Sequence, residues 1–130
     1  MPKKNFPNFR QLAKTIGLLL AGKKAEDILI LDVRKLTYLT DYFLIACGNS
    51  TIHLRTLRET LENKLAKERI YPFRKEGAFS SGWQVLDYGG VIVHLFLPEI
   101  YKFYHIDKLW QGARKVSWKT QITADKKQRG

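Results

Sequence analysis

The sequence is poor in cysteine and contains no long apolar run. Cys47 is its single cysteine, so the chain cannot form an internal disulfide, and no oxidising compartment is indicated. No apolar stretch approaches the length that crosses a bilayer, and residues 18–20 (three leucines) are too few for a signal-peptide core. We therefore expect a cytoplasmic protein with no membrane partner. An organellar location stays open, because the first residues are basic and acid-poor as in a transit peptide.

The motifs of several enzyme classes are also missing. There is no P-loop and no GxGxxG segment. The three histidines, His53, His94 and His105, are far apart, and no pair has the short spacing of familiar metal sites. Cys47 ends an apolar run, which predicts a buried structural thiol rather than an accessible nucleophile. The sequence thus predicts no catalytic residue, no metal and no cofactor, and we expect a protein that is not an enzyme.

The positive charge of the chain is confined to its two ends. The chain has 130 residues and a net charge of +11. Residues 1–24 hold six basic and no acidic side chains, residues 114–130 hold six basic and one acidic, and residues 25–113 balance to zero. Basic ends suit either salt-dependent contact with RNA phosphates or simple solubility, and both readings stay open. The candidate RNA contacts are Lys115, Lys119, Lys126 and Lys127.

The first half of the chain predicts two helices and two buried strands. Apolar residues spaced by three and four positions predict an amphipathic helix at residues 8–22, capped by Asn8. Continuous apolar runs predict strands at 28–33 and 42–47, each buried on both faces. A leucine stripe after the cap Ser50 predicts a second helix to about residue 69, with its charged side chains in solvent.

The second half predicts a short strand beginning at residues 71–73, a hairpin and a last helix. Gly89-Gly90 is a two-residue hairpin turn, and it pairs Trp83 with Phe96 and Val85 with His94. Asp87 and His94 then share one face of the hairpin. We expect them to form a hydrogen bond; the alternative is that they order a docking surface beside Trp83.

The element order predicts a single domain of the α/β class, in the broad α+β sense, with a mixed sheet and flanking helices. The final helix would run from Pro98 to Gly112. We place the domain at residues 1–116, including helix 8–22. Residues 117–130 form a basic tail that we expect to be flexible, with Trp118 as a candidate anchor.

A turn at residues 48–50 (Gly-Asn-Ser), between a strand and a helix, hints at nucleotide chemistry. In nucleotidyltransferases a glycine-serine turn at such a place precedes two carboxylates that hold magnesium. Here the following helix offers His53, Arg55 and Arg58 instead, and its first acid is Glu59. The chemistry of a transferase is therefore missing, and at most a related fold without catalysis remains.

A longer pattern runs through most of the chain. Its pieces are Leu31-Asp32-Val33, Asp41 to Ile45, Gly48 with Ser50 and His53, Glu76-Gly77, Trp83, Leu86 to Gly89, Val91 to Phe96, Phe103-Tyr104 and Leu109-Trp110. In this order they resemble the ribosome-silencing factor family, also called Iojap-like. The chain departs from the family at Gly90, where aspartate is usual, and at Tyr101, where arginine is usual. Ile106-Asp107 replaces the usual leucine-glutamate.

The resemblance implies a nucleotidyltransferase-like fold without catalytic carboxylates, and a function without cofactors. It implies binding to the large ribosomal subunit through large-subunit ribosomal protein fourteen, which blocks joining of the small subunit and represses translation. Organellar relatives assist large-subunit assembly, and free members are often homodimers. The docking surface, or its immediate support, is then expected at Trp83, Leu86, Asp87, Tyr88, His94, Tyr104, Leu109 and Trp110.

Two other readings stay open beside this one. A large-subunit assembly factor or RNA-binding protein would act through its basic termini and bind bare RNA in a salt-sensitive way. A purely structural homodimer would pair the aromatic hairpin with itself.

Overall fold

The computed structural model describes residues 8–119, apart from the side chains of Phe79 and Asp107. Its helices are α1 (Phe9–Gly22), α2 (Thr51–Ala66) and α3 (Pro98–Phe103), with short 3-10 turns η1 (Phe79–Ser81) and η2 (Ile106–Lys108). Its strands are β1 (Glu26–Asp32), β2 (Tyr42–Cys47), β3 (Arg74–Glu76), β4 (Trp83–Asp87), β5 (Val91–Phe96) and β6 (Arg114–Val116).

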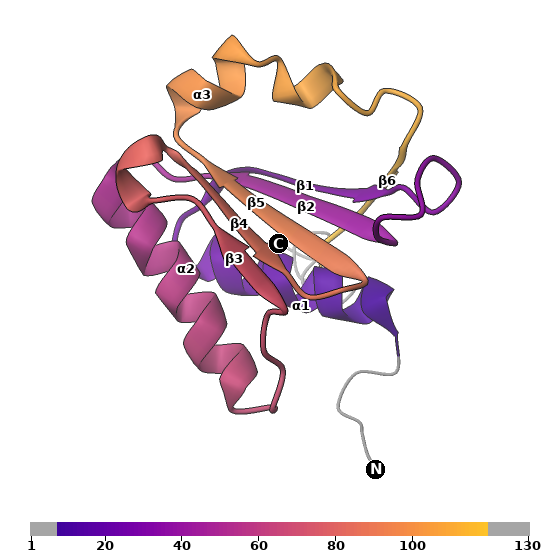
Figure 1. The fold of residues 1–130 in the computed structure, drawn as a ribbon, viewed down its shortest axis with the longest axis horizontal. Coiled ribbons are helices and arrows are strands. Elements are labelled where there is room, and N and C mark those ends of the chain that lie inside the picture. The colour runs from indigo at the N-terminus through magenta and orange to yellow at the C-terminus, as the bar shows by residue number, and fades with distance from the viewer. Residues whose placement is uncertain (1–7, 120–130) are drawn as a thin grey trace, which may run out of the picture.

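One mixed sheet with the strand order β3-β4-β5-β2-β1-β6 forms the centre of the molecule. The central pair β2 and β5 is parallel, and every other pair is antiparallel. Helices α1 and α2 lie below the sheet in Figure 1, and α3 with η2 arches above it. The predicted single domain with a mixed sheet and flanking helices is thus confirmed.

The two long helices begin where their capping residues predict. Asn8 Oδ1 accepts a hydrogen bond from the Gln11 amide at 2.7 Å, and Ser50 Oγ accepts one from the His53 amide at 3.0 Å. These bonds satisfy amides that have no partner within the first helical turn. The apolar stripes of both helices then pack on one face of the sheet: Leu12, Ile16 and Leu20 from α1, and Leu54, Leu57, Leu61 and Leu65 from α2.

The hairpin β4–β5 has the predicted register. Trp83 lies opposite Phe96 and Val85 opposite His94, and the Tyr88 amide donates to the Val91 carbonyl at 2.8 Å. At the turn, a Cβ on Gly90 would overlap the Phe9 ring of α1. This close approach leaves no room for a side chain at Gly90 unless the Phe9 ring moves.

Two features differ from the sequence prediction. The final helix is broken, because His105 adopts a left-handed conformation (φ 51°) between α3 and η2. Arg114–Val116, predicted as the start of an aperiodic tail, forms β6 and pairs with β1, where Val116 lies opposite Ile30. Trp118 packs on the α1 side of the core, as expected of an anchor. The part of the tail that holds Lys126 and Lys127 lies outside the described residues.

Candidate docking surface

The two faces of the sheet are covered to different extents. The face toward α1 and α2 is closed by the large core cluster. The opposite face is called the aromatic face below. Within residues 8–119 it is covered by the short α3–η2 segment and its flanking residues alone. Its side chains are Phe43, Trp83, Val85, His94 and Phe96 from the sheet, with Tyr101, Tyr104 and Trp110 from the covering segment.

Trp83 is the centre of this face. Its ring centroid lies 4.9 Å from that of Phe96 and 5.9 Å from that of Tyr104. Its indole Nε1 donates a hydrogen bond to His94 Nδ1 at 3.2 Å. An Nδ1 that accepts is unprotonated, and burial lowers the pKa of His94 to about 4. His94 is therefore neutral near pH 7, and it orients the indole.

The prediction of a hydrogen bond between Asp87 and His94 is wrong. Asp87 Oδ1 accepts from the Gly89 amide at 2.8 Å, and its other oxygen lies 3.6 Å from Arg74 Nη2. In the hairpin register Asp87 is opposite Ile92, next to the turn, and His94 is opposite Val85. Asp87 thus holds the turn and the edge strand, and Trp83 takes the position beside His94.

The other predicted docking residues divide into two groups. Leu86 and Tyr88 are only 0% and 4% exposed and point into the core against α1 and α2, so they can support a docking surface but not touch a partner directly. Tyr104 and Leu109 are 49% and 57% exposed. Trp110 is half-buried, with its ring 5.0 Å from that of Phe43. The aromatic face therefore unites Trp83, His94, Tyr104 and Trp110.

Two of the four candidate RNA contacts, Lys115 and Lys119, lie within the described residues. Lys115 is exposed on β6, which is at the opposite edge of the sheet from β3. Lys119 is also exposed, and its amine lies 5.8 Å from the centre of the Trp118 ring. These lysines are thus separated from the β4 side of the aromatic face, and their contact with RNA stays a prediction.

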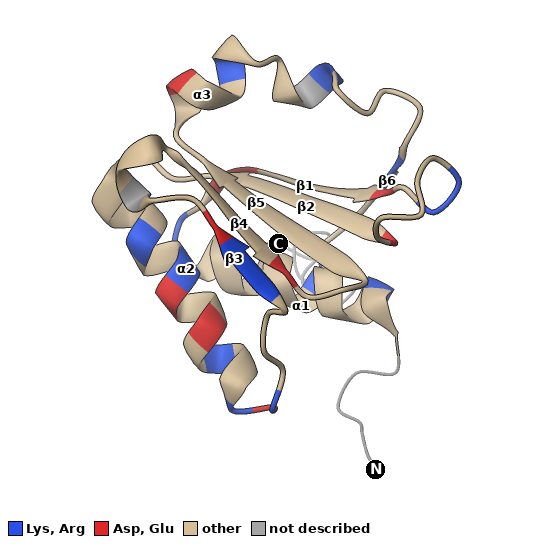
Figure 2. Ribbon diagram, viewed as in Figure 1, with Lys and Arg blue, Asp and Glu red and all other residues tan. Residues whose placement is uncertain are grey.

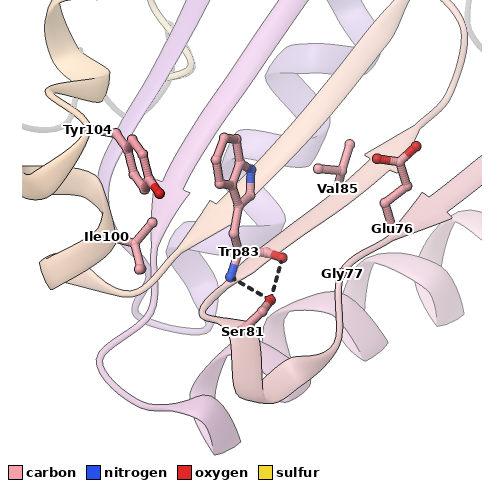
Figure 3. A pocket seen from close by; sticks show the side chains of 7 residues that line it. All are labelled: Glu76, Gly77, Ser81, Trp83, Val85, Ile100 and Tyr104. Carbon is pink, nitrogen blue, oxygen red and sulfur yellow. Dashed lines mark hydrogen bonds between the residues drawn. The ribbon is translucent and has the colours of Figure 1, made fainter.

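An open pocket of about 370 Å³ lies where β3 and β4 meet α3 (Figure 3). Its lining residues are Glu76, Gly77, Ser81, Trp83, Val85, Ile100 and Tyr104. Sequence reasoning identified Trp83 and Tyr104 but not the others. It also missed the exposed Phe103 next to Tyr104. Glu76-Gly77 was visible only as part of the family pattern, because nothing in its local spacing places it beside Trp83.

Cys47 and His53, the side chains considered as candidates for catalysis, have structural roles in the fold. Burial raises the pKa of the Cys47 thiol to about 12, which confirms the predicted inert thiol. At the glycine-serine turn, His53 Nε2 bonds to the Lys23 carbonyl at 2.8 Å and its Nδ1 accepts from the Asn49 amide. Within residues 8–119, no cluster of three or more His, Cys, Asp or Glu side chains could bind a metal ion. No described helix is long and apolar enough to cross a membrane.

The fold and the aromatic face define a small single-domain protein with a mixed sheet and an incompletely covered apolar surface. The chain belongs to the family described as "Ribosomal silencing factor during starvation" (RsfS), whose model matches residues 7–130. The resemblance seen in the sequence is thereby confirmed.

Relatives and solved structures agree with this assignment. The ribosomal silencing factor RsfS of Bacillus subtilis is 31% identical over 82% of this chain and 90% of its own length. A mouse protein, "Mitochondrial assembly of ribosomal large subunit protein 1", is 38% identical over 71% of this chain and 42% of its own length. A crystal structure of a Chromobacterium violaceum protein superimposes with a TM-score of 0.72 at 32% identity, covering 85% of this chain and 92% of that one.

Proposed function

We propose that this protein binds the large ribosomal subunit through large-subunit ribosomal protein fourteen and sterically blocks joining of the small subunit, so that translation is repressed. Membership of the silencing-factor family supports the ribosomal target. The observation that carries the docking site is the aromatic face, where Tyr104 packs on the half-buried Trp83 and where Tyr104, Phe103 and Leu109 are exposed. The proposal places the protein in the cytoplasm, or in an organelle.

The mechanism requires occupied space and a good interface, and no chemical step. Tryptophan and tyrosine side chains are enriched among the residues that supply most of the affinity at a protein interface. Trp83 is held by the hydrogen bond to His94 and by the ring of Phe96, so little side-chain entropy remains to be lost on binding. We accordingly propose that the protein acts without catalysis.

We also propose that the free protein is a homodimer that covers this same face. An exposed apolar surface favours self-association when no other partner is present. Docking on the ribosome would then require the dimer to open.

A second candidate function is assembly of the large subunit. It is favoured by the 38% identity to the mouse protein, whose name describes assembly of the mitochondrial large subunit. In this reading Lys115 and Lys119, with Lys126 and Lys127 beyond the described residues, would contact ribosomal RNA. Removal of residues 119–130 should then lower both the affinity for the subunit and its salt dependence.

The test is co-sedimentation with isolated large and small subunits. We expect binding to the large subunit alone, weakened at least about tenfold by Tyr104→Ala or Trp83→Ala. Tyr38→Ala is the matched control, because Tyr38 is fully exposed on the loop between β1 and β2. Equal binding to both subunits and to bare RNA, unchanged by Trp83→Ala, would contradict the proposal and favour the basic termini.

A further inference from the structure

The pocket on the aromatic face combines aromatic and apolar walls with a single carboxylate. In Figure 3, Trp83 lies between Tyr104 and Ile100 on one side and Val85 and Glu76 on the other. Among the seven described residues that line the pocket, Glu76 alone carries a charge.

The Ser81 hydroxyl of the pocket already has hydrogen-bond partners. Ser81 Oγ lies 2.7 Å from the Ala78 carbonyl and 3.1 Å from the Trp83 carbonyl, and it accepts from the Trp83 amide at 3.3 Å. The hydroxyl therefore holds the loop before β4 in place. Gly77 has a φ of 97°, and a Cβ there would overlap the Trp83 carbonyl, so only glycine lets the chain pass this close to the pocket. Glu76 remains as the group that can recognise a charged ligand.

The charge of Glu76 is only partly balanced by its neighbours. Arg74 Nη1 lies 3.6 Å from Glu76 Oε2, and Arg74 Nη2 lies 3.6 Å from Asp87 Oδ2. One guanidinium thus faces the carboxylates of two residues, one on β3 and one on β4. Figure 2 shows the acidic residues of these two strands in red. Lys75 points to the opposite face of the sheet, where its amine pairs with Glu62 at 3.0 Å. The edge of the pocket therefore keeps an excess of negative charge.

We propose that this pocket receives an arginine or lysine side chain from a partner protein. The alkyl stem of such a residue would pass Ile100 and Tyr104 and lie against the Trp83 ring, and its charged end would face the Glu76 carboxylate beside Val85. A phosphate would be repelled by Glu76, and a purely apolar side chain would desolvate the carboxylate without replacing its hydrogen bonds. The inference rests on the proposed docking function and adds the chemistry that the partner must present.

The first experiment measures large-subunit binding of charge variants. We expect Glu76→Gln to weaken binding about three- to fivefold, because the carboxylate is partly exposed. Glu76→Arg should weaken it by about tenfold or more, since attraction becomes repulsion. Glu59→Gln, an exposed position on α2, is the matched control and should bind like wild type. Wild-type affinity of both Glu76 variants would overturn the proposal.

The second experiment probes the pocket without the ribosome. N-acetyl-arginine amide and its uncharged isostere N-acetyl-citrulline amide are titrated into the protein at a concentration where analytical ultracentrifugation shows a monomer, so that no second copy covers the pocket. The indole N–H resonance of Trp83, assigned with Trp83→Phe, is followed by NMR. We expect the arginine amide to bind saturably with a dissociation constant of about 1 mM. The citrulline amide should bind about tenfold more weakly. Glu76→Gln should abolish this preference.

The two experiments separate the two proposals. Arginine-selective binding at Trp83 by a protein that does not bind large subunits would refute the proposed function and support the pocket chemistry. Binding to large subunits without any preference for arginine over citrulline would refute the pocket inference and leave the proposed function standing.

Discussion

Gly17 tests how the end of the described chain packs on α1. A methyl group at Gly17 would lie 2.7 Å from Trp118 Cβ and 3.2 Å from Trp118 Cγ. The nearest atom is the first carbon of the side chain, so no rotation of the indole removes the overlap. In Gly17→Ala, the segment that carries Trp118 must therefore move away from the helix.

Two opposing effects decide the stability of this variant. Replacing glycine by alanine inside a helix stabilises a protein by about 1 kcal/mol when space allows. Forcing an extra methyl group into a packed contact costs about 1–3 kcal/mol. We therefore expect Gly17→Ala to lower the free energy of unfolding by about 1 kcal/mol, the opposite sign to that predicted from helix propensity.

Urea unfolding followed by circular dichroism measures the effect. In a Trp118→Gly background the two closest atoms are gone, and the next neighbour, Ile30 Cδ1 at 3.7 Å, is an ordinary contact. The same substitution should there raise the free energy of unfolding by about 1 kcal/mol. A Trp118→Ala background keeps the Cβ and should not restore the full gain. Gly22→Ala, where nothing lies within 4 Å, is the matched control.

A Gly17→Ala protein about 1 kcal/mol more stable than wild type, with the fluorescence of Trp118 unchanged, would refute this reasoning. It would mean that Trp118 does not pack on α1 at this position.

Three further predictions concern the turn, the aromatic face and the core. Gly90→Asp should lower the free energy of unfolding by about 1–3 kcal/mol in urea, because the new Cβ overlaps the Phe9 ring. Adding Phe9→Ala should relieve this loss. A Gly90→Asp protein as stable as wild type would contradict the contact. Since the folded pKa of His94 is about 4, below its ordinary 6.5, the unfolded chain takes up the proton first, so stability should fall from about pH 6.5 to pH 4. In His94→Phe the free energy of unfolding should depend much less on pH over this range. An unchanged pH dependence would mean that other groups cause it. Cys47 should not react with iodoacetamide at about pH 8.5 until the protein is unfolded, and fast reaction of the folded protein would show that the thiol is accessible.

Local interactions allowed much of the fold to be predicted from the sequence. The caps Asn8 and Ser50 lie within three residues of the amides they bind, and the Gly89-Gly90 turn determines the hairpin register by itself. Alternation along the strands separated the face of Trp83 from that of Leu86. The ordered motifs also pointed to the family, which the comparison confirmed.

The tertiary structure alone decided which face of the sheet the long helices leave uncovered and which distant residues contact each other. Alternation does not show which face the long helices cover, so Leu86 and Tyr88 could not be distinguished from docking residues. The surroundings of Arg58 could not be predicted from the sequence either. Its charge suggested a solvated helix surface, yet its guanidinium donates a hydrogen bond to the buried Gln84 at 2.6 Å.

The site itself depends on contacts between residues distant in the chain. Glu76 and Tyr104 become walls of one pocket only because β3 pairs with β4 and α3 folds back over Trp83. A three-residue strand such as β6 carries no periodicity of its own, and β1 supplies the hydrogen bonds that make it a strand. The sequence by itself thus determined the local elements, the faces of the hairpin and the family. The packing of distant segments, which no local spacing encodes, decided the open aromatic face and its pocket.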